Sequence, residues 1–374
     1  MRKTAVSAFF AAGALGAASA AFAAPTVTLY GVIDTGLTYE RVHGGDQSLS
    51  MSTGNYAGSR FGLKGSEDLG SGYKVSFNLE AGYASDTGAA GQSGSLFNRE
   101  TYVAVTGPFG TAGAGRIGPF TSGTGSYSRY WDLEPFETGY ADAGIQATQV
   151  NVWSRHSNTI YYVSPKFSGF EAGAQYAFAG DADRETTGMA ADDHFGNVYV
   201  RWDGETVKTA AGVEVYSVGH NQQGTSPDKT RWSVKWAGAW NPEKGPVTLY
   251  AGVNWMKNQA KFSDVTWDDD AKLAFDGSGR GLDATAYFLG AKYQAGPAAF
   301  LASVQYLDGE NKGAKAGAER DYKRWVAGLG VHYFFSKRTM AYGVASYAKG
   351  SGLLGDDGTA TNRTVVQAGM THWF

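Results

Sequence analysis

The feature that most constrains this chain is an alternation of apolar and polar residues that repeats from Val27 to the C-terminus. In residues 73–83 (YKVSFNLEAGY), every second side chain is apolar or aromatic, and those between them are polar. A period of two residues is that of a β-strand with one apolar and one polar face. The sequence therefore predicts an all-β protein whose strands present two chemically different faces.

Sixteen candidate strands can be identified, and the connections between them alternate in length. The strands are expected to begin near Val27, Ser59, Tyr73, Phe97, Thr111, His156, Phe170, Phe195, Val207, Thr230, Pro246, Leu282, Ala298, Tyr322, Thr339 and Thr364. Short connections such as 69–72 and 203–206 are rich in turn residues, whereas the long ones lie near 38–57, 84–96, 118–154, 179–194, 218–229, 258–281, 307–321 and 349–363. This order suits antiparallel strands whose first and last members pair and close the sheet.

The alternation fits two kinds of fold. In a soluble sandwich or barrel the apolar faces meet in a core, whereas in an outer-membrane barrel they face lipid and the polar faces line a lumen. Strands of ten or more residues can cross a bilayer when tilted, and large polar residues such as Lys74, Asn78 and Glu80 suit a water-filled lumen. Aromatic residues gather at strand ends, as in interfacial girdles. We therefore predict a transmembrane antiparallel β-barrel of 16 strands, wide enough to hold an aqueous channel.

The N-terminus has a different character. Arg2 and Lys3 precede a short Ala-rich apolar stretch, and Ala21-Phe22-Ala23 fits the cleavage rule of export signals. A membrane anchor helix is the alternative, but the stretch is short and ends at a cleavage site. We expect residues 1–23 to be a cleaved signal peptide and residues 24–374 to form one barrel domain.

Composition and motifs exclude several other functions. The 374 residues include no cysteine, so thiolate zinc sites, disulfide scaffolds and cysteine nucleophiles are excluded. A formal net charge of −3 gives no basis for binding nucleic acid, and the six histidines lack metal-ligand spacing. A G-x-G-x-x-G match at 113–118 is followed by Pro119 rather than by a helix. We expect no enzyme activity, no cofactor and no metal.

Three blocks of sequence resemble the general porins of Gram-negative outer membranes, above all those of the beta-proteobacterial branch. These blocks are residues 27–37 (VTLYGVIDTGL), 59–83 (SRFGLKGSEDLGSGYKVSFNLEAGY) and 97–118 (FNRETYVAVTGPFGTAGAGRIG). The ending VVQAGMTHWF, with terminal Phe374, is similar to the signal read by the barrel assembly machinery, although His372 stands where the family often has Tyr.

The resemblance implies a homotrimer in the bacterial outer membrane, in contact with lipid and lipopolysaccharide. Each protomer would be one water-filled pore for passive diffusion of small hydrophilic solutes and ions. The third outer loop, here residues 118–154, would fold inward and narrow that pore. A loop of this length without secondary structure tends to be functional.

The resemblance also assigns residues to the narrowest point of the pore. Asp132, Glu134 and Glu137 are similar to the acidic tip of the family's constriction loop, and the sequence leaves open which of them faces the pore. The family's arginine ladder corresponds here to Arg60, Arg99 and Arg155.

The alternation of apolar and polar residues along a strand indicates which of these side chains face the lumen. Phe61 and Leu63 form an apolar row, so Arg60 and Lys64 are expected to face the lumen. Arg99 shares a face with Thr101 and Val103, which places Glu100 on the outward side, at the rim or beside a partner. Each arginine taken alone can equally be a wall salt bridge that only supports the barrel, and the loop acids can be solvated outer-loop charges.

Basic and acidic groups on facing walls would create a transverse field in a narrow, low-dielectric passage. With three arginines and Lys64 on one wall, we expect a weak preference for anions. A substrate-specific outer-membrane channel is the alternative, and a barrel enzyme is a more distant one because no nucleophile constellation stands out.

Overall fold

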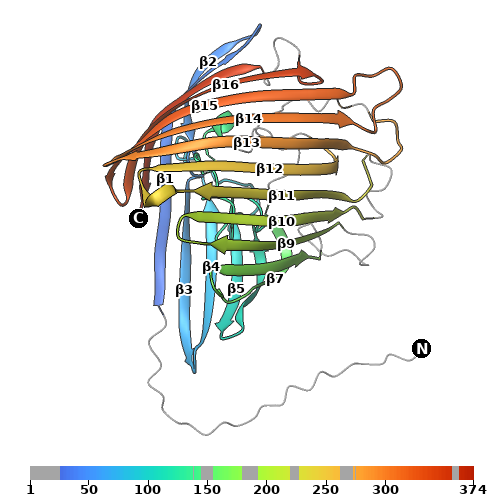
Figure 1. Ribbon diagram of the computed structural model, residues 1–374. Helices are drawn as coiled ribbons and strands as arrows, with labels where there is room; N and C mark the ends of the chain where they lie inside the picture. Colours follow the sequence, from blue (N-terminus) through green and yellow to red (C-terminus); the bar gives the residue numbers. More distant parts are fainter. Residues whose placement is uncertain are drawn as a thin grey trace, which may run out of the picture.

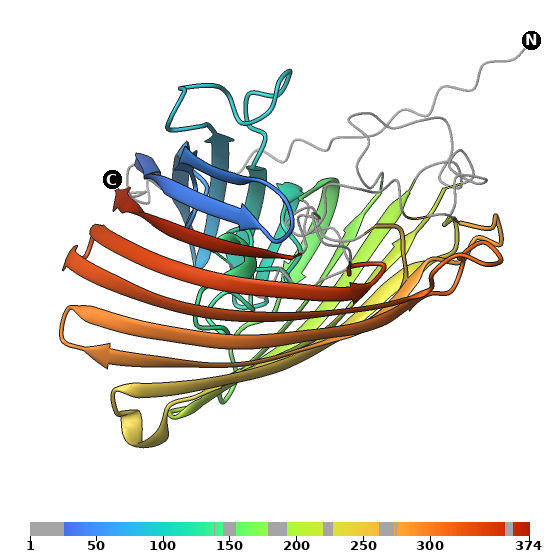
Figure 2. The same ribbon diagram turned by 90° about the horizontal axis from the view of Figure 1, so that it is seen from above.

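The computed structural model shows a closed antiparallel β-barrel (Figure 1 and Figure 2). It describes residues 26–137, 139–144, 155–178, 193–219, 227–261, 273, 275–355 and 362–374. The barrel closes where β1 (Thr26–Val42) pairs with β17 (Arg363–Trp373), from Val32 opposite Trp373 to Val42 opposite Arg363. Closure pairs the backbone groups of the two terminal strands, which a sheet in hydrocarbon requires.

The remaining strands follow one another around the barrel, each antiparallel to its neighbours. They are β2 (Gln47–Thr53), β3 (Arg60–Gly70), β4 (Tyr73–Gly82), β5 (Glu100–Gly107), β6 (Gly110–Ile117), β7 (His156–Val163), β8 (Phe170–Ala177), β9 (His194–Asp203), β10 (Val207–Ser217), β11 (Arg231–Trp240), β12 (Val247–Gln259), β13 (Leu282–Ala295), β14 (Ala298–Asn311), β15 (Asp321–Ser336) and β16 (Thr339–Gly352). The described residues also include the 3-10 turns η1 (Ala141–Ala143) and η4 (Pro242–Lys244). Within the described ranges, no helix is both long and apolar enough to cross a membrane.

Strands β2 and β3 together make one strand of the barrel. β2 pairs with residues 35–41 of β1 and β3 with residues 26–32, while residues 54–59 leave the sheet between them. Counted in this way, the barrel has the 16 strands that the sequence predicts. Two predicted starts differ from the structure: β5 begins at Glu100 rather than near Phe97, and the strand made of β2 and β3 begins at Gln47, so the predicted start at Ser59 matches only its β3 part. Each of the other predicted starts lies within one residue of the observed one.

The predicted long connection over residues 38–57 is wrong. β1 continues to Val42, and β2 returns beside it after a turn at residues 43–46. Residues 47–53 (QSLSMST) hold only two apolar side chains, Leu49 and Met51, so their alternation is too short to mark a strand. Backbone pairing with β1 determines this strand, and composition alone does not reveal such pairing.

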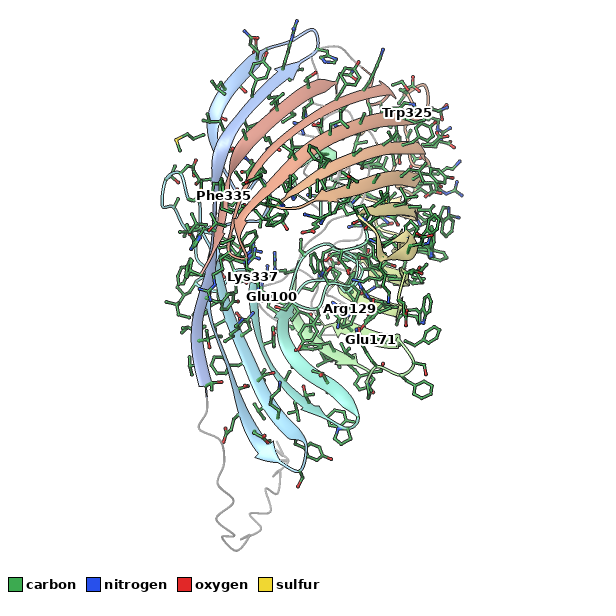
Figure 3. All side chains as sticks on the ribbon, turned by 60° about the vertical axis from the view of Figure 1, so that its left-hand side comes forward. Glu100, Arg129, Glu171, Trp325, Phe335 and Lys337 are labelled. Atoms are coloured by element: carbon green, nitrogen blue, oxygen red, sulfur yellow. The ribbon has the colours of Figure 1, made fainter. Side chains whose placement is uncertain are left out.

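The two faces of the sheet differ as the alternation predicts. On β15, Trp325 and Leu329 are exposed, whereas Arg324 and Val326 are buried inside the barrel. Figure 3 shows Trp325 and Phe335 pointing away from the barrel, while Glu100, Arg129 and Glu171 lie within it. An outer surface of exposed large apolar side chains is what a lipid-facing barrel presents.

The last residue completes the seam of the barrel. The backbone N–H of Phe374 donates to the Gly31 carbonyl and the Gly31 N–H donates to the Phe374 carbonyl, both at 3.1 Å. The predicted signal peptide, residues 1–23, lies outside the described residues, so the division into signal and barrel stays a prediction.

Candidate functional site

The segment that connects β6 and β7 lies against the inner wall of the barrel. Wall residues hold its described part at separate points: Asn197 of β9 accepts from Phe120 N at 3.0 Å, the Lys235 carbonyl of β11 accepts from the Tyr130 hydroxyl at 3.1 Å, and Gln305 of β14 donates to the Ala143 carbonyl at 3.0 Å. Residues 120–143 therefore pass across the inside of the barrel. Residues 145–154, the remainder of this connection before Arg155, lie outside the described ranges.

The end of this segment is fixed by a buried ion cluster. The Asp142 carboxylate accepts from Nη2 of Arg324 on β15 at 2.8 Å and from Nε of Arg363 on β17 at 2.6 Å. Burial favours the neutral acid, but the two guanidinium groups outweigh it and hold the pKa of Asp142 below its usual range. Sequence reasoning missed Asp142, because no local pattern separates it from the other acids of the segment.

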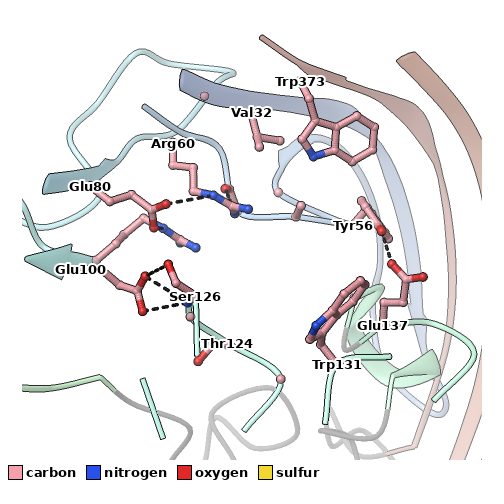
Figure 4. A pocket seen from close by; sticks show the side chains of 18 of the residues that line it. Val32, Tyr56, Arg60, Glu80, Glu100, Thr124, Ser126, Trp131, Glu137 and Trp373 are labelled. Atoms are coloured by element: carbon pink, nitrogen blue, oxygen red, sulfur yellow. Dashed lines mark hydrogen bonds and ion pairs between the residues drawn. The ribbon is translucent and has the colours of Figure 1, made fainter. Parts of the chain in front are cut away.

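Between this segment and strands β1, β3 and β4 lies a cavity of about 840 Å³ (Figure 4). Its lining joins charged and aromatic side chains from several elements. The charged ones are Arg60, Lys64, Glu80, Arg99, Glu100, Glu137 and Arg155, and the large aromatic ones include Tyr30, Tyr56, Tyr102, Trp131, Tyr140 and Trp373.

All four predicted basic residues line this cavity. Glu80 of β4 lies between two of them, with its Oε1 2.7 Å from Arg99 Nε and its Oε2 3.3 Å from Arg60 Nε. Arg155 Nε and Nη2 are buried and have no hydrogen-bond partner among the described residues, and Lys64 Nζ lies 4.8 Å from the centre of the Tyr30 ring. Alternation placed Glu80 in the lumen, but nothing in the sequence showed that it joins two arginines.

The predicted facing of Glu100 is wrong. Glu100 is buried inside the barrel and accepts from Ser126 N at 3.0 Å, while Val103 is exposed on the outer side. Arg99 directly precedes β5, so the alternation of that strand does not determine its direction, and its side chain reaches Glu80. Glu100 thus holds the segment inside the barrel to the wall.

The three predicted loop acids occupy different environments. Glu137 lines the cavity, where it accepts from the Tyr56 hydroxyl and lies 4.0 Å from Lys292 Nζ. Burial raises the pKa of Glu137 above its usual value. Asp132 and Glu134 are not among the residues that line the cavity.

Asp132 is engaged elsewhere on the wall. Its two oxygens accept from Arg201 of β9 at 2.7 and 2.8 Å, and Lys208 lies 3.2 Å away. Burial works against ionisation, yet these cations keep the pKa of Asp132 below its usual range. Glu134 is buried. Asp132 therefore ties the segment to the far wall rather than facing the arginines.

Comparison with known proteins identifies the family. The model of the Gram-negative porins matches residues 5–353. This chain belongs to the Gram-negative porin family. An outer membrane porin protein of Bordetella pertussis is 31% identical over 100% of both chains, and outer membrane porin protein 32 of Delftia acidovorans is 31% identical, covering 96% of this chain and 97% of that one. The solved anion-selective porin from Comamonas acidovorans has a TM-score of 0.69 and 25% identity, over 94% of this chain and 100% of that one.

Membership of this family confirms the prediction of an outer-membrane channel rather than an enzyme. In the parts of the porin that the structure describes, no group of three or more His, Asp or Glu side chains is arranged to hold a metal ion.

A second segment of this porin, residues 54–59, also enters the lumen. The Asp34 carboxylate on β1 accepts from the backbone N–H groups of Tyr56 and Ala57, both at 3.0 Å, and from the Tyr342 hydroxyl at 2.8 Å. Tyr56 is thereby directed inward, where its hydroxyl contacts Glu137 (Figure 4). Gly54 and Gly58 signal a break in the strand, but the sequence did not show that the break lies inside the pore.

Proposed function

We propose that this porin passes small hydrophilic solutes and ions by passive diffusion, with a weak preference for anions set at the cavity. The main support for this proposal is the lining of the cavity, which includes four basic and three acidic residues. These are Arg60, Lys64, Arg99, Arg155, Glu80, Glu100 and Glu137. Glu80 is already paired with two arginines, and Glu137 is bound by Tyr56. Lys64 is exposed and has no ion-pair partner among the described residues. The side chains of Arg60 and Arg99 stay 24% and 19% exposed beside Glu80, so these three cations are available to a passing anion.

Local charge, rather than the net charge of the chain, sets this preference. At physiological ionic strength the screening length is about 8 Å, so outer-loop acids act weakly on an ion inside the cavity. Low-dielectric walls focus the field of the nearby arginines. The Comamonas acidovorans porin, named as anion-selective, supports the same sign of selectivity.

The finer assignments of assembly and site rest on the resemblance to porins. We expect a homotrimer in contact with outer-membrane lipid and lipopolysaccharide, exported by a signal peptide of residues 1–23. Phe374 is expected to be read by the barrel assembly machinery. The exposed apolar outer face and the position of Phe374 at the closing seam are consistent with these roles.

Reconstitution in a planar bilayer under a salt gradient tests the proposal. The parent protein should give ohmic conductance and a reversal potential on the anion side, whereas a substrate-specific channel should give saturable conductance. Changing Arg60, Arg99 and Arg155 together to Gln should move the reversal potential toward cations.

The matched control removes the same charge away from the cavity. Arg280, Arg320 and Arg338 are exposed and do not line the cavity, so their joint change to Gln should leave the reversal potential nearly unchanged. Equal shifts in both triple variants, or no shift in either, would remove the assignment of the arginines to the selective site.

A further inference from the structure

Trp131 lies inside the barrel with its side chain exposed, whereas its neighbours in the segment are buried. It is 46% exposed, whereas Tyr130 beside it is 6% exposed and Leu133 is fully buried. Tyr130 and Leu133 pack with wall residues in one apolar cluster and so fix the backbone of the segment. The indole ring of Trp131, which is not part of that cluster, is presented to the cavity.

The cationic residues stand on the other side of the same space. Figure 4 shows Trp131 across the open cavity from Arg60 and Glu80, with Thr124 and Ser126 at its edge. The interior of a membrane barrel is generally polar, and in this cavity Trp373 and several tyrosines add aromatic surface to that of Trp131. An indole face opposite guanidinium groups therefore offers two distinct contacts to one solute.

These contacts have complementary chemistry. Guanidinium groups donate paired hydrogen bonds to a carboxylate, and an indole face packs in an offset or edge arrangement against another aromatic ring. Arg60 and Arg99 contact Glu80 through Nε and keep 24% and 19% of their side chains exposed, so an incoming carboxylate need not displace Glu80 to reach them. Glu137, the acid on the side of Trp131, is already bound by Tyr56 and lies 4.0 Å from Lys292.

We propose that this cavity is a binding subsite for aromatic carboxylates, with the carboxylate at the wall of Arg60, Arg99 and Arg155 and the ring against Trp131. The cavity of about 840 Å³ is large enough to hold a single-ring acid, which would obstruct the passage while it is bound. The subsite depends on the proposed function, because a solute reaches it only through an open, anion-conducting pore.

Single-channel recording in KCl with added benzoate tests the subsite. Cyclohexanecarboxylate has the same charge and a similar size but no π-face, and benzylammonium has the aromatic ring with the opposite charge. Benzoate should block the current with a half-blocking concentration roughly three- to tenfold below that of cyclohexanecarboxylate, the range expected of one aromatic pair. Benzylammonium should block more weakly than benzoate.

Two substitutions of Trp131 and one control locate the effect. Trp131→Ala should remove the difference between benzoate and cyclohexanecarboxylate, and Trp131→Phe should retain most of it. Trp325→Ala, on the lipid-facing side, should leave the difference intact.

The outcomes separate the subsite from the pore. Equal block of the parent by benzoate and cyclohexanecarboxylate overturns the subsite even if no variant folds, and so does a preference that survives in Trp131→Ala. Equal block by benzylammonium and benzoate overturns the role of the arginines. Absence of any ion current, or a cation preference of the parent, overturns the proposed function itself.

Discussion

Asp142 gives the sharpest test of how the segment inside the barrel is held. Asp142→Asn keeps the shape of the side chain but removes its charge, so Arg324 and Arg363 lose the carboxylate that they share. Asp142 and Arg324 are both fully buried, whereas Arg363 keeps a second partner, Glu40, at 3.0 Å. Removing one member of a buried ion pair costs about 3–5 kcal/mol. Because Arg363 retains Glu40, we expect the low end, about 3 kcal/mol.

Urea unfolding from lipid vesicles, followed by tryptophan fluorescence, measures this loss as a shift of the transition midpoint. Single-channel recording should show greater open-state current noise, because the end of the segment leaves β15 and β17 more often. Asp68→Asn is the control, since Asp68 is exposed and its carboxylate accepts the backbone N–H of Gly70 in a turn, at 2.8 Å.

A double variant tests the mechanism. Asp142→Asn combined with Arg324→Met also removes the buried guanidinium group that has lost the Asp142 carboxylate, so the double variant should recover part of the lost stability. The reasoning is refuted if Asp142→Asn unfolds within about 0.5 kcal/mol of the parent, the range usual for substitutions away from such features, and its current is no noisier.

Two further predictions concern the cavity and the seam. Because burial raises the pKa of Glu137, this carboxylate should become neutral at a higher pH than an ordinary glutamate as the pH falls. The cavity then loses one negative charge, so the preference for anions should increase. Reversal potentials from pH 8 to pH 4 measure this change, and a pH step that persists in Glu137→Gln would contradict it. Deleting Phe374 removes its two backbone hydrogen bonds with Gly31 and should lower the yield of folded barrel in the outer membrane. Heat-modifiable gel mobility measures that yield, and Phe374→Tyr should assemble nearly normally. Normal assembly of the deletion variant would reject the role of the terminal Phe374.

The strands and their facing were largely predictable because they depend on local chemistry. A lipid-facing side chain and a lumen-facing side chain alternate along one strand, so the residues of β15 or β4 report their own facing. Two features of the barrel lack that local signal. β2 is mostly polar and is held by β1, and Arg99 lies just outside the regular strand.

The site was predictable only in part. Arg60, Lys64, Arg99 and Arg155 do line one cavity with Glu137. The sequence could not show that Asp132 forms an ion pair with Arg201, since the two residues are 69 positions apart in the chain. Separation in sequence also hid the contacts of Asp142 with Arg324 and Arg363, 182 and 221 positions away, and of Asp34 with Tyr56, 22 positions away.

The sequence by itself determined a closed, two-faced sheet, because a period of two residues repeated along the chain allows each strand to bury or expose its faces in only one way. Which charges are neutralised and which stay available to a solute was decided only by the tertiary structure. Closing the barrel and placing residues 118–144 inside it bring together groups that are remote in the chain. Pairing across that distance assigns Glu80 to Arg60 and Arg99, and leaves Trp131 facing the pore.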